Sequence, residues 1–216
     1  MRRSRYTGTG RPGFTLVELL VAIAIIAVIA SILLVVFPRT REMARRTACV
    51  SNCKQLLAAA RMYAHDHDQR LAPAITRGAP VPDKGYTWCV TLQPYIENEQ
   101  VLICPSDREA QATPGFVCLP HSYGMNYRLT YNTAFGLSPG ALTSKLTTSH
   151  QHSSLILIFE MDSKASDPGG SYVWHRLSRV RPRHGERATF GFLDGHADTL
   201  LPEETVQPEN MWEERK

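Results

Sequence analysis

The sequence lacks several motifs that would indicate a metal site or a catalytic site. None of its five cysteines forms a Cys-x-x-Cys pair, which argues against a zinc site built from paired thiolates. No loop matches a calcium-binding motif well, and no motif names a catalytic nucleophile. No internal repeat or low-complexity tract is found in the 216 residues. The default expectation is therefore one ordinary domain beyond the N-terminal region, without catalytic activity.

An excess of charge of one sign is also missing once the N-terminus is set aside. The formal net charge is +4, and the first 37 residues hold four arginines and one glutamate, which leaves +1 for the remainder. A nearly neutral remainder has no overall electrostatic footprint for nucleic acid, so we predict no nucleic-acid partner. One local basic cluster is interpreted as a solvated face: Arg176, Arg179, Arg181, Arg183 and Arg187.

One long apolar run dominates what is present. It extends from Leu19 to Phe37 and only Ser31 interrupts it. Counted from Phe14 the segment has about 24 residues, and as a helix it would be about 36 Å long, enough to cross the hydrocarbon core of a bilayer. Glu18 is unusual in such a helix, because placing a carboxylate in lipid costs about 3 kcal/mol or more. We therefore predict a membrane helix in which this carboxylate has a cationic partner.

The residues around this glutamate resemble the N-terminal signature of type IV prepilins and type II secretion pseudopilins. A basic leader ends at Gly13, and Phe14 is followed by Thr-Leu-Val-Glu-Leu-Leu. The resemblance implies that a prepilin peptidase cleaves between Gly13 and Phe14 and that the new amino group of Phe14 is methylated. It also implies that Glu18 neutralises the Phe14 amine of a neighbouring subunit during filament assembly, which would supply the cationic partner. The implied partners are the peptidase, copies of this chain and other pseudopilins, and an inner-membrane assembly platform.

Two other interpretations of the N-terminus remain open. A secretory signal peptide also has a basic region and an apolar region, and cleavage after Val28-Ile29-Ala30 would fit. An unprocessed signal anchor is the second. The length of the run and its carboxylate disfavour the signal peptide. Arginines flank the run on both sides, so the positive-inside rule gives no orientation. The resemblance places the protein in the bacterial inner membrane with one span and its C-terminal domain in the periplasm or outside the cell.

Beyond the apolar run we expect the helix to continue and to pack on a globular domain. Pro38 removes one backbone hydrogen bond but need not end a helix. Apolar residues from Cys49 to Tyr63 recur at spacings of three and four, as on one face of a helix. Strands are predicted over 154–160 and 188–193, so the fold class is α+β and pilin-like, with a long helix on a small antiparallel sheet. The expected segments are a leader (1–13), a transmembrane helix (14–37), an amphipathic helix (38–68), a globular domain (69–201) and a flexible tail (202–216).

A histidine, nine further residues and Asp-Gly form a second motif, made by His184, Asp194 and Gly195. It resembles the C-terminal hallmark of a large pseudopilin-like family. We interpret Asp194-Gly195 as a two-residue type I′ hairpin turn that returns the chain as a strand over 196–201. The rival interpretation is a membrane-tethered metal-binding or hydrolytic domain, with His184 as a base that Asp194 orients. The structural interpretation is preferred because the sequence names no nucleophile.

The sequence does not determine how the cysteines pair or whether an ion binds. Cys49 and Cys53 lie one helical turn apart, where a disulfide would be strained, so both are expected to be small buried apolar groups. We expect a disulfide between Cys104 and Cys118, or one in which Cys89 is the partner. No cofactor is predicted, and whether the histidine motif binds an ion is left open. Calcium binding remains an alternative, in which four carboxylates would supply the oxygen ligands: Glu160, Asp162, Asp167 and Asp198.

Overall fold

The structure is a computed structural model, and it forms two compact units, Met1–Arg41 and Glu42–Lys216. Helix α1 (Leu16–Asp66) runs from the first unit into the second and continues through Pro38, as predicted. The leader before residue 13 and Asp167 and Arg176 lie outside the described residues. The residues described are 13–76, 85–110, 112, 116–130, 153–162, 172–173, 179–206 and 211–212.

The first unit exposes nearly all of its apolar side chains. The large apolar residues from Phe14 to Phe37 are 51% to 78% exposed. In the part of the chain that the structure describes, α1 is the one helix long and apolar enough to cross a membrane. Such a surface is compatible with a single-pass membrane anchor, because an exposed apolar patch of this length requires either lipid or other apolar helices as its surroundings.

The part of α1 in the second unit buries one face. This confirms the amphipathic pattern, and the buried residues are Cys49, Cys53, Leu56, Leu57, Ala59, Ala60 and Ala64. The helix ends at Asp66 because Asp68 and Gln69 adopt positive φ angles of 53° and 62°. The Gln69 amide then donates to the Ala64 carbonyl at 2.8 Å, which satisfies one of the carbonyl groups left free at a helix end.

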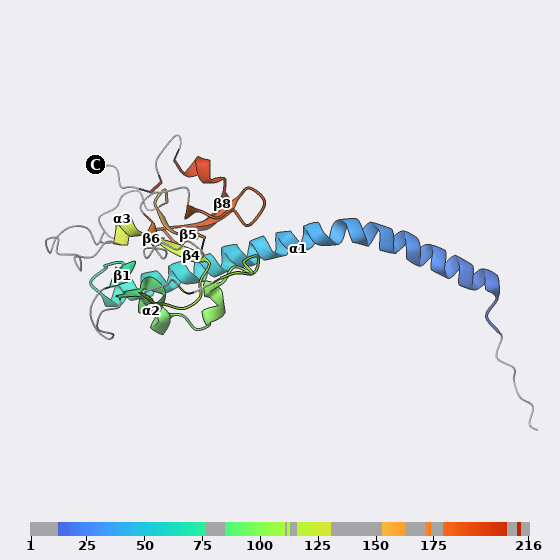
Figure 1. Ribbon diagram of the computed structural model, residues 1–216, viewed down its shortest axis with the longest axis horizontal. Coiled ribbons are helices and arrows are strands. Elements are labelled where there is room, and N and C mark those ends of the chain that lie inside the picture. The colour runs from blue at the N-terminus through green and yellow to red at the C-terminus, as the bar shows by residue number, and fades with distance from the viewer. Residues whose placement is uncertain are drawn as a thin grey trace, which may run out of the picture. The chain divides into compact units, whose positions relative to one another are not determined.

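Among the described residues the larger sheet has five strands in the order β6-β4-β5-β7-β8, of which Figure 1 labels β4, β5, β6 and β8. Strands β4, β5, β7 and β8 pair antiparallel, which confirms the α+β, pilin-like prediction, whereas the edge strand β6 pairs parallel with β4. The strand bounds are Tyr123–Asn126 (β4), Ile156–Glu160 (β5), Tyr172–Val173 (β6), Ala188–Phe192 (β7) and Ala197–Leu200 (β8).

A smaller, three-stranded sheet and several short helices complete the second unit. In this sheet β2 pairs antiparallel with β1 and parallel with β3. The bounds are Ile75–Thr76 (β1), Gly85–Thr87 (β2) and Phe116–Val117 (β3) for the strands, and Trp88–Thr91 (α2), Gln93–Tyr95 (η1), Glu99–Leu102 (η2), Tyr127–Thr130 (α3) and Pro202–Thr205 (η5) for the helices.

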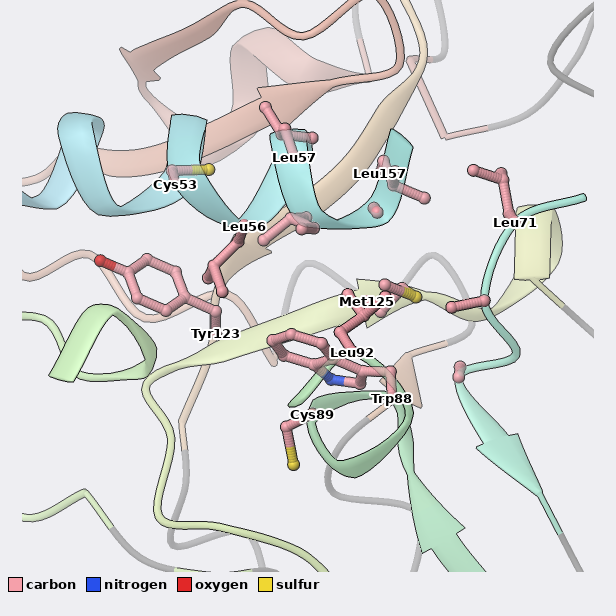
Figure 2. Close-up of a cluster of buried hydrophobic side chains, with 14 of the residues drawn as sticks. Cys53, Leu56, Leu57, Leu71, Trp88, Cys89, Leu92, Tyr123, Met125 and Leu157 are labelled. Carbon is pink, nitrogen blue, oxygen red and sulfur yellow. The ribbon is translucent and has the colours of Figure 1, made fainter. Parts of the chain in front are cut away.

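The main core lies where α1 meets β4, β5 and α2. Figure 2 shows Leu56 of α1 pointing toward β4, the strand of Tyr123 and Met125, with Trp88 of α2 on the far side of that strand. All four side chains are at most 1% exposed. Each fully buried side chain of this size contributes about 1.5–3 kcal/mol relative to an exposed one. This packing fixes the second half of α1 against the sheet.

Helix α1 approaches β7 closely at Gly191. A Cβ atom at this position would lie 2.6 Å from Cys53 Sγ and 2.8 Å from Leu57 Cδ1. A larger residue at 191 would therefore force the Cys53 and Leu57 side chains, or the helix that carries them, to shift. A small side chain at position 53 suits the same narrow gap.

Residues 202–206 and 211–212 of the predicted flexible tail are packed in the second unit, so a flexible tail is wrong for these described residues. Trp212 is fully buried, and its ring lies edge-on to Phe159 with centroids 4.9 Å apart. Its indole Nε1 donates to Thr205 Oγ1 at 2.9 Å. The predicted tail is mostly polar, but the side chain of Trp212 is large and apolar enough to anchor residues 211–212 in the core.

Candidate functional site

The start of α1 is closed by reciprocal hydrogen bonds between Thr15 and Glu18. The Thr15 amide and hydroxyl both donate to Glu18 Oε2, at 2.9 and 2.7 Å, and the Glu18 amide donates to Thr15 Oγ1 at 3.2 Å. This is a capping box, in which a threonine before the helix and a glutamate three residues later satisfy each other's free amides. The Thr-x-x-Glu pattern in the sequence is the signal for this cap, which burial in lipid alone does not predict.

This cap gives Glu18 a structural role within one chain. Gly13 and Phe14 precede the helix, and the Phe14 side chain is 76% exposed. The Glu18 carboxylate therefore lies about one helical turn from Phe14. Cleavage after Gly13 would release the amino group of Phe14. The capping role and the assembly role expected from the resemblance are compatible, because a carboxylate offers about four lone-pair sites.

His184 is held in a buried polar centre between α1 and the larger sheet. Its side chain is 1% exposed, and Nδ1 donates to Glu42 Oε1 of α1 at 2.8 Å. Its Nε2 lies 3.3 Å from Glu160 Oε1 at the end of β5 and 3.5 Å from Cys104 Sγ. The histidine precedes β7, and Gly185 follows it with a φ of 73°, a conformation that favours glycine. The turn therefore directs the imidazole inward.

Two carboxylates determine the charge of this histidine. Burial lowers the pKa of His184, but Glu160 and Glu42 raise it by more, so the pKa lies above its usual value. Glu160 is fully buried, and its other oxygen accepts from the Thr189 amide at 2.7 Å. The charges of the two carboxylates favour an imidazolium between them, so the centre links α1, β5 and the segment before β7.

A disulfide joins Cys49 of α1 to Cys104, 55 residues further along the chain. The predicted pairing of Cys104 with Cys118 or Cys89 is therefore wrong, and so is the expectation that Cys49 is only an apolar group. Cys53, Cys89 and Cys118 form no disulfide. Burial raises the pKa of both the Cys53 and the Cys89 thiol. Sequence spacing could not identify this pair, because only the packing of α1 brings the two cysteines together.

Asp194 and Gly195 do form the β7–β8 hairpin, but the predicted type I′ turn is wrong. The Gly195 amide donates to the Phe192 carbonyl, and the Phe192 amide donates to the His196 carbonyl, both at 2.9 Å. Gly195 has a φ of 97°, whereas Asp194 has no positive φ. This is a three-residue loop, a type I turn followed by a glycine bulge. Asp194 Oδ1 stabilises it by accepting from the His196 amide at 3.0 Å and from His196 Nδ1 at 2.6 Å.

The two members of the histidine motif lie in different surroundings. His184 is enclosed by Glu42, Glu160 and Cys104, whereas the Asp194 side chain is 34% exposed and bonds His196. Asp194 therefore does not orient His184, although the rival hydrolytic interpretation requires it to do so.

Metal-ligating side chains gather at one place among the described residues. This group consists of Cys49, Cys104, Glu160 and His184, all buried. Of the carboxylates expected for calcium, only Glu160 belongs to it. Asp162 and Asp198 are not part of the group. Calcium binding by these carboxylates stays a prediction.

The predicted basic face is divided between internal and solvent-facing groups. Arg183 pairs with Asp107 at 2.6 Å inside the protein, and Arg187 lies 3.6 Å from Glu204. Arg181 is exposed, while Arg179 is half-buried. The described arginines therefore do not act as one continuous cationic surface, because two of them neutralise carboxylates of the same chain.

Comparison with known families agrees with the N-terminal features. Residues 10–34 match the prokaryotic N-terminal methylation motif, and residues 38–102 match a family described as a protein of unknown function, DUF1559. No curated protein and no solved structure matches. The matched residues end before His184, so the C-terminal histidine motif is outside them. The chain thus combines a prepilin-type methylation motif with a DUF1559 segment, which is consistent with a type IV pilin-like or pseudopilin-like protein processed by prepilin peptidase.

Proposed function

We propose that this prepilin-like chain is a structural subunit of a type II secretion pseudopilus or type IV pilus-like filament. The observation that carries the proposal is the apolar surface of α1 from Phe14 to Phe37, which the rest of the chain leaves exposed. Before assembly this surface is accommodated by the membrane, and after assembly by the same helices of neighbouring subunits. The second unit, from Glu42 onward, would face outward from the filament.

Glu18 gives such a bundle its register. An apolar helix packs against another in many longitudinal positions, whereas one carboxylate and one terminal ammonium per chain favour a single offset. Breaking a buried ion pair costs about 3–5 kcal/mol, so this offset would dominate over the alternatives. The proposed partners are prepilin peptidase, copies of this chain and other pseudopilins, and the inner-membrane assembly platform. In this arrangement the second unit lies in the periplasm or outside the cell.

The first test is the chemical state of the N-terminus. Mass spectrometry of the protein isolated from its native host should find a chain that begins at a methylated Phe14. A chain that begins at Ser31 would indicate a signal peptide, and an uncut Met1 would indicate a signal anchor. Either result would contradict the proposal.

The second test separates the charge of Glu18 from its capping role. Glu18→Gln keeps the capping box, since glutamine also serves at this position, but removes the anion. Thr15→Ala is the matched control, because it removes the threonine hydroxyl from the cap, at about 1 kcal/mol, while the charge remains. With peptidase processing intact, Glu18→Gln should abolish sheared filaments and Thr15→Ala should retain them. Normal filament yield from Glu18→Gln would exclude Glu18 as the assembly residue.

The alternative, a membrane-tethered metal-binding or hydrolytic domain that uses His184 and Asp194, receives less support. Its two named residues have separate hydrogen-bond partners, and His184 is closed off from solvent. We expect no hydrolytic activity from this chain. An esterase or peptidase activity that His184→Ala abolishes in folded protein would reverse this preference.

A further inference from the structure

The buried polar centre holds four side chains of the types that bind transition metals. Cys49, Cys104, Glu160 and His184 each present one ligand atom, and these atoms lie within 4.8 Å of one another. They come from α1, the loop after η2, the end of β5 and the segment before β7. Two sulfurs, one imidazole nitrogen and one carboxylate oxygen suit a tetrahedral Zn²⁺ ion.

The free atoms of this group point into a common space. His184 Nδ1 is engaged by Glu42, which leaves Nε2 directed toward Glu160 Oε1 and Cys104 Sγ. Glu160 Oε2 is engaged by the Thr189 amide, whereas Oε1, fully buried, makes no hydrogen bond of good geometry. Nδ1 and Oε2 are therefore engaged by other groups, whereas Oε1 and Nε2, once Nε2 has lost its proton, face the two sulfurs. A carboxylate that orients a metal-bound imidazole through its other nitrogen is a frequent partner in metal sites.

In the oxidised protein the disulfide prevents this group from binding a metal, because its sulfurs are not thiolates and carry no negative charge. We propose that reduction of the Cys49–Cys104 disulfide converts the centre into a site for one divalent cation of the Zn²⁺ type. Its ligands are Cys49, Cys104, Glu160 and His184. A dithiol reductant supplies two electrons and two protons and is itself oxidised to a disulfide. The two thiols and the Nε2 of the His184 imidazolium then lose their protons to solvent as the cation binds.

The site provides a second way to crosslink the same segments. In the oxidised protein a covalent bond joins α1 to the loop after η2, and in the reduced protein the cation would join both to β5 and to the segment before β7. The inference concerns only the second unit and does not depend on filament assembly, so the two proposals can fail separately.

The test uses the full-length protein in detergent micelles with Co²⁺ as the probe. After reduction with a dithiol and removal of the reductant without air, the protein should bind one Co²⁺ per chain. It should show thiolate-to-cobalt charge transfer in the ultraviolet and tetrahedral ligand-field bands in the visible. Zn²⁺ should displace Co²⁺ and abolish the visible bands, because Zn²⁺ binds such sites more tightly. The oxidised protein should show none of these bands.

Variants assign the ligands. Cys104→Ser should lose most of the charge-transfer intensity, whereas Cys118→Ser and Cys89→Ser, the matched controls, should keep it. Glu42→Gln should weaken Co²⁺ binding about 10–100-fold while the band positions stay the same, since this residue orients His184 without touching the metal. Circular dichroism and tryptophan fluorescence of each reduced protein establish that it is folded.

Three results would overturn the proposal. One is a reduced wild-type protein that is folded and binds no Co²⁺. Another is equal binding in both redox states without charge transfer, which would indicate surface groups such as His65 and Asp66. The third is loss of the charge-transfer band in Cys118→Ser with its retention in Cys104→Ser.

Discussion

Asp107 and Arg183 form an ion pair 2.6 Å long in which both side chains are almost fully removed from solvent, at 6% and 8% exposure. Arg183 also donates to the carbonyls of Met161 at 2.7 Å and Ser122 at 3.3 Å. Asp107 lies three residues after Cys104, and Arg183 immediately precedes His184. The pair therefore links the segment that supplies Cys104 to the buried polar centre with the segment that supplies His184.

A double-mutant cycle on this pair should reveal strong coupling. Asp107→Asn or Arg183→Gln alone should lower the free energy of unfolding by about 3–5 kcal/mol, because each leaves a buried charge without its partner. The double variant should lose markedly less than the sum of the two single losses. Urea unfolding of the full-length protein in micelles, followed by tryptophan fluorescence, gives the four values. Losses that add within about 0.5 kcal/mol would show that the pair is not coupled.

Reduction of the Cys49–Cys104 disulfide should lower stability substantially. The bond closes a loop with a sequence separation of 55. For a loop of this length the chain-entropy model gives about 4 kcal/mol. Urea unfolding with and without reductant, with a chelator present in both, measures the difference, and Cys118→Ser serves as the control that should change little. Non-reducing peptide mapping should recover Cys49 linked to Cys104. A link from Cys104 to Cys118 or Cys89 would contradict the structure.

Trp212→Ala should destabilise the second unit by about 3–5 kcal/mol, the usual cost of truncating a buried aromatic residue. Its ring packs on Phe159 and Phe190, and its backbone carbonyl accepts from Asn126 Nδ2 at 3.1 Å. Trp212→Phe should recover most of the loss but not the hydrogen bond to Thr205. A change below about 0.5 kcal/mol for Trp212→Ala would mean that this segment is free in solution. Thermal unfolding of the three proteins in micelles makes the comparison.

His121 should make the protein less stable as the pH falls below about 6.5, the ordinary pKa of histidine. The residue is fully buried, and burial lowers its pKa although the Leu119 carbonyl, 2.7 Å from Nδ1, acts in the opposite direction. As the pH decreases, the unfolded chain takes up a proton at this position before the folded chain does, so unfolding is favoured. The slope is at most about 1.4 kcal/mol per pH unit for one group.

His121→Gln should remove this contribution. The difference in unfolding free energy between wild type and variant, measured in urea at several pH values, should favour wild type most near pH 7.5 and shrink toward about pH 5. A difference that does not vary with pH would show that His121 titrates at the same pH in the folded and unfolded chain. The comparison between the two proteins cancels the titration of the other groups.

Much of the fold could be predicted because its signals are local. The apolar run and the three-and-four spacing identify α1, since a helix repeats its faces over a few residues. Strands β5 and β7 are short apolar runs, and Asp194-Gly195 marks the hairpin between β7 and β8. The exact turn type could not be read from the two residues alone, because Leu193 also belongs to the loop.

The buried polar centre could not be predicted in the same way. Glu42 lies among arginines on a helix that reads as solvated, and Glu160 ends an apolar strand as an ordinary polar residue. Only the packing of α1 on the sheet places both beside His184. The sequence identified His184 as unusual but could not supply its partners, which lie 142 and 24 residues away in the chain. Long-range pairing of this kind is a property of the assembled fold.

The bond between Cys49 and Cys104 also determines how mechanical force crosses the second unit. Tension applied through the first unit enters at Glu42 and reaches Cys49 after about two helical turns. There a covalent bond carries part of the load directly to the loop after η2. The later turns of α1, with the apolar contacts around Leu56 and Leu57, therefore bear less of the load than they would in an uncrosslinked chain. If the chain assembles as proposed, a subunit pulled by its N-terminal helix is held by this bond near the start of its second unit, before the strain reaches the core.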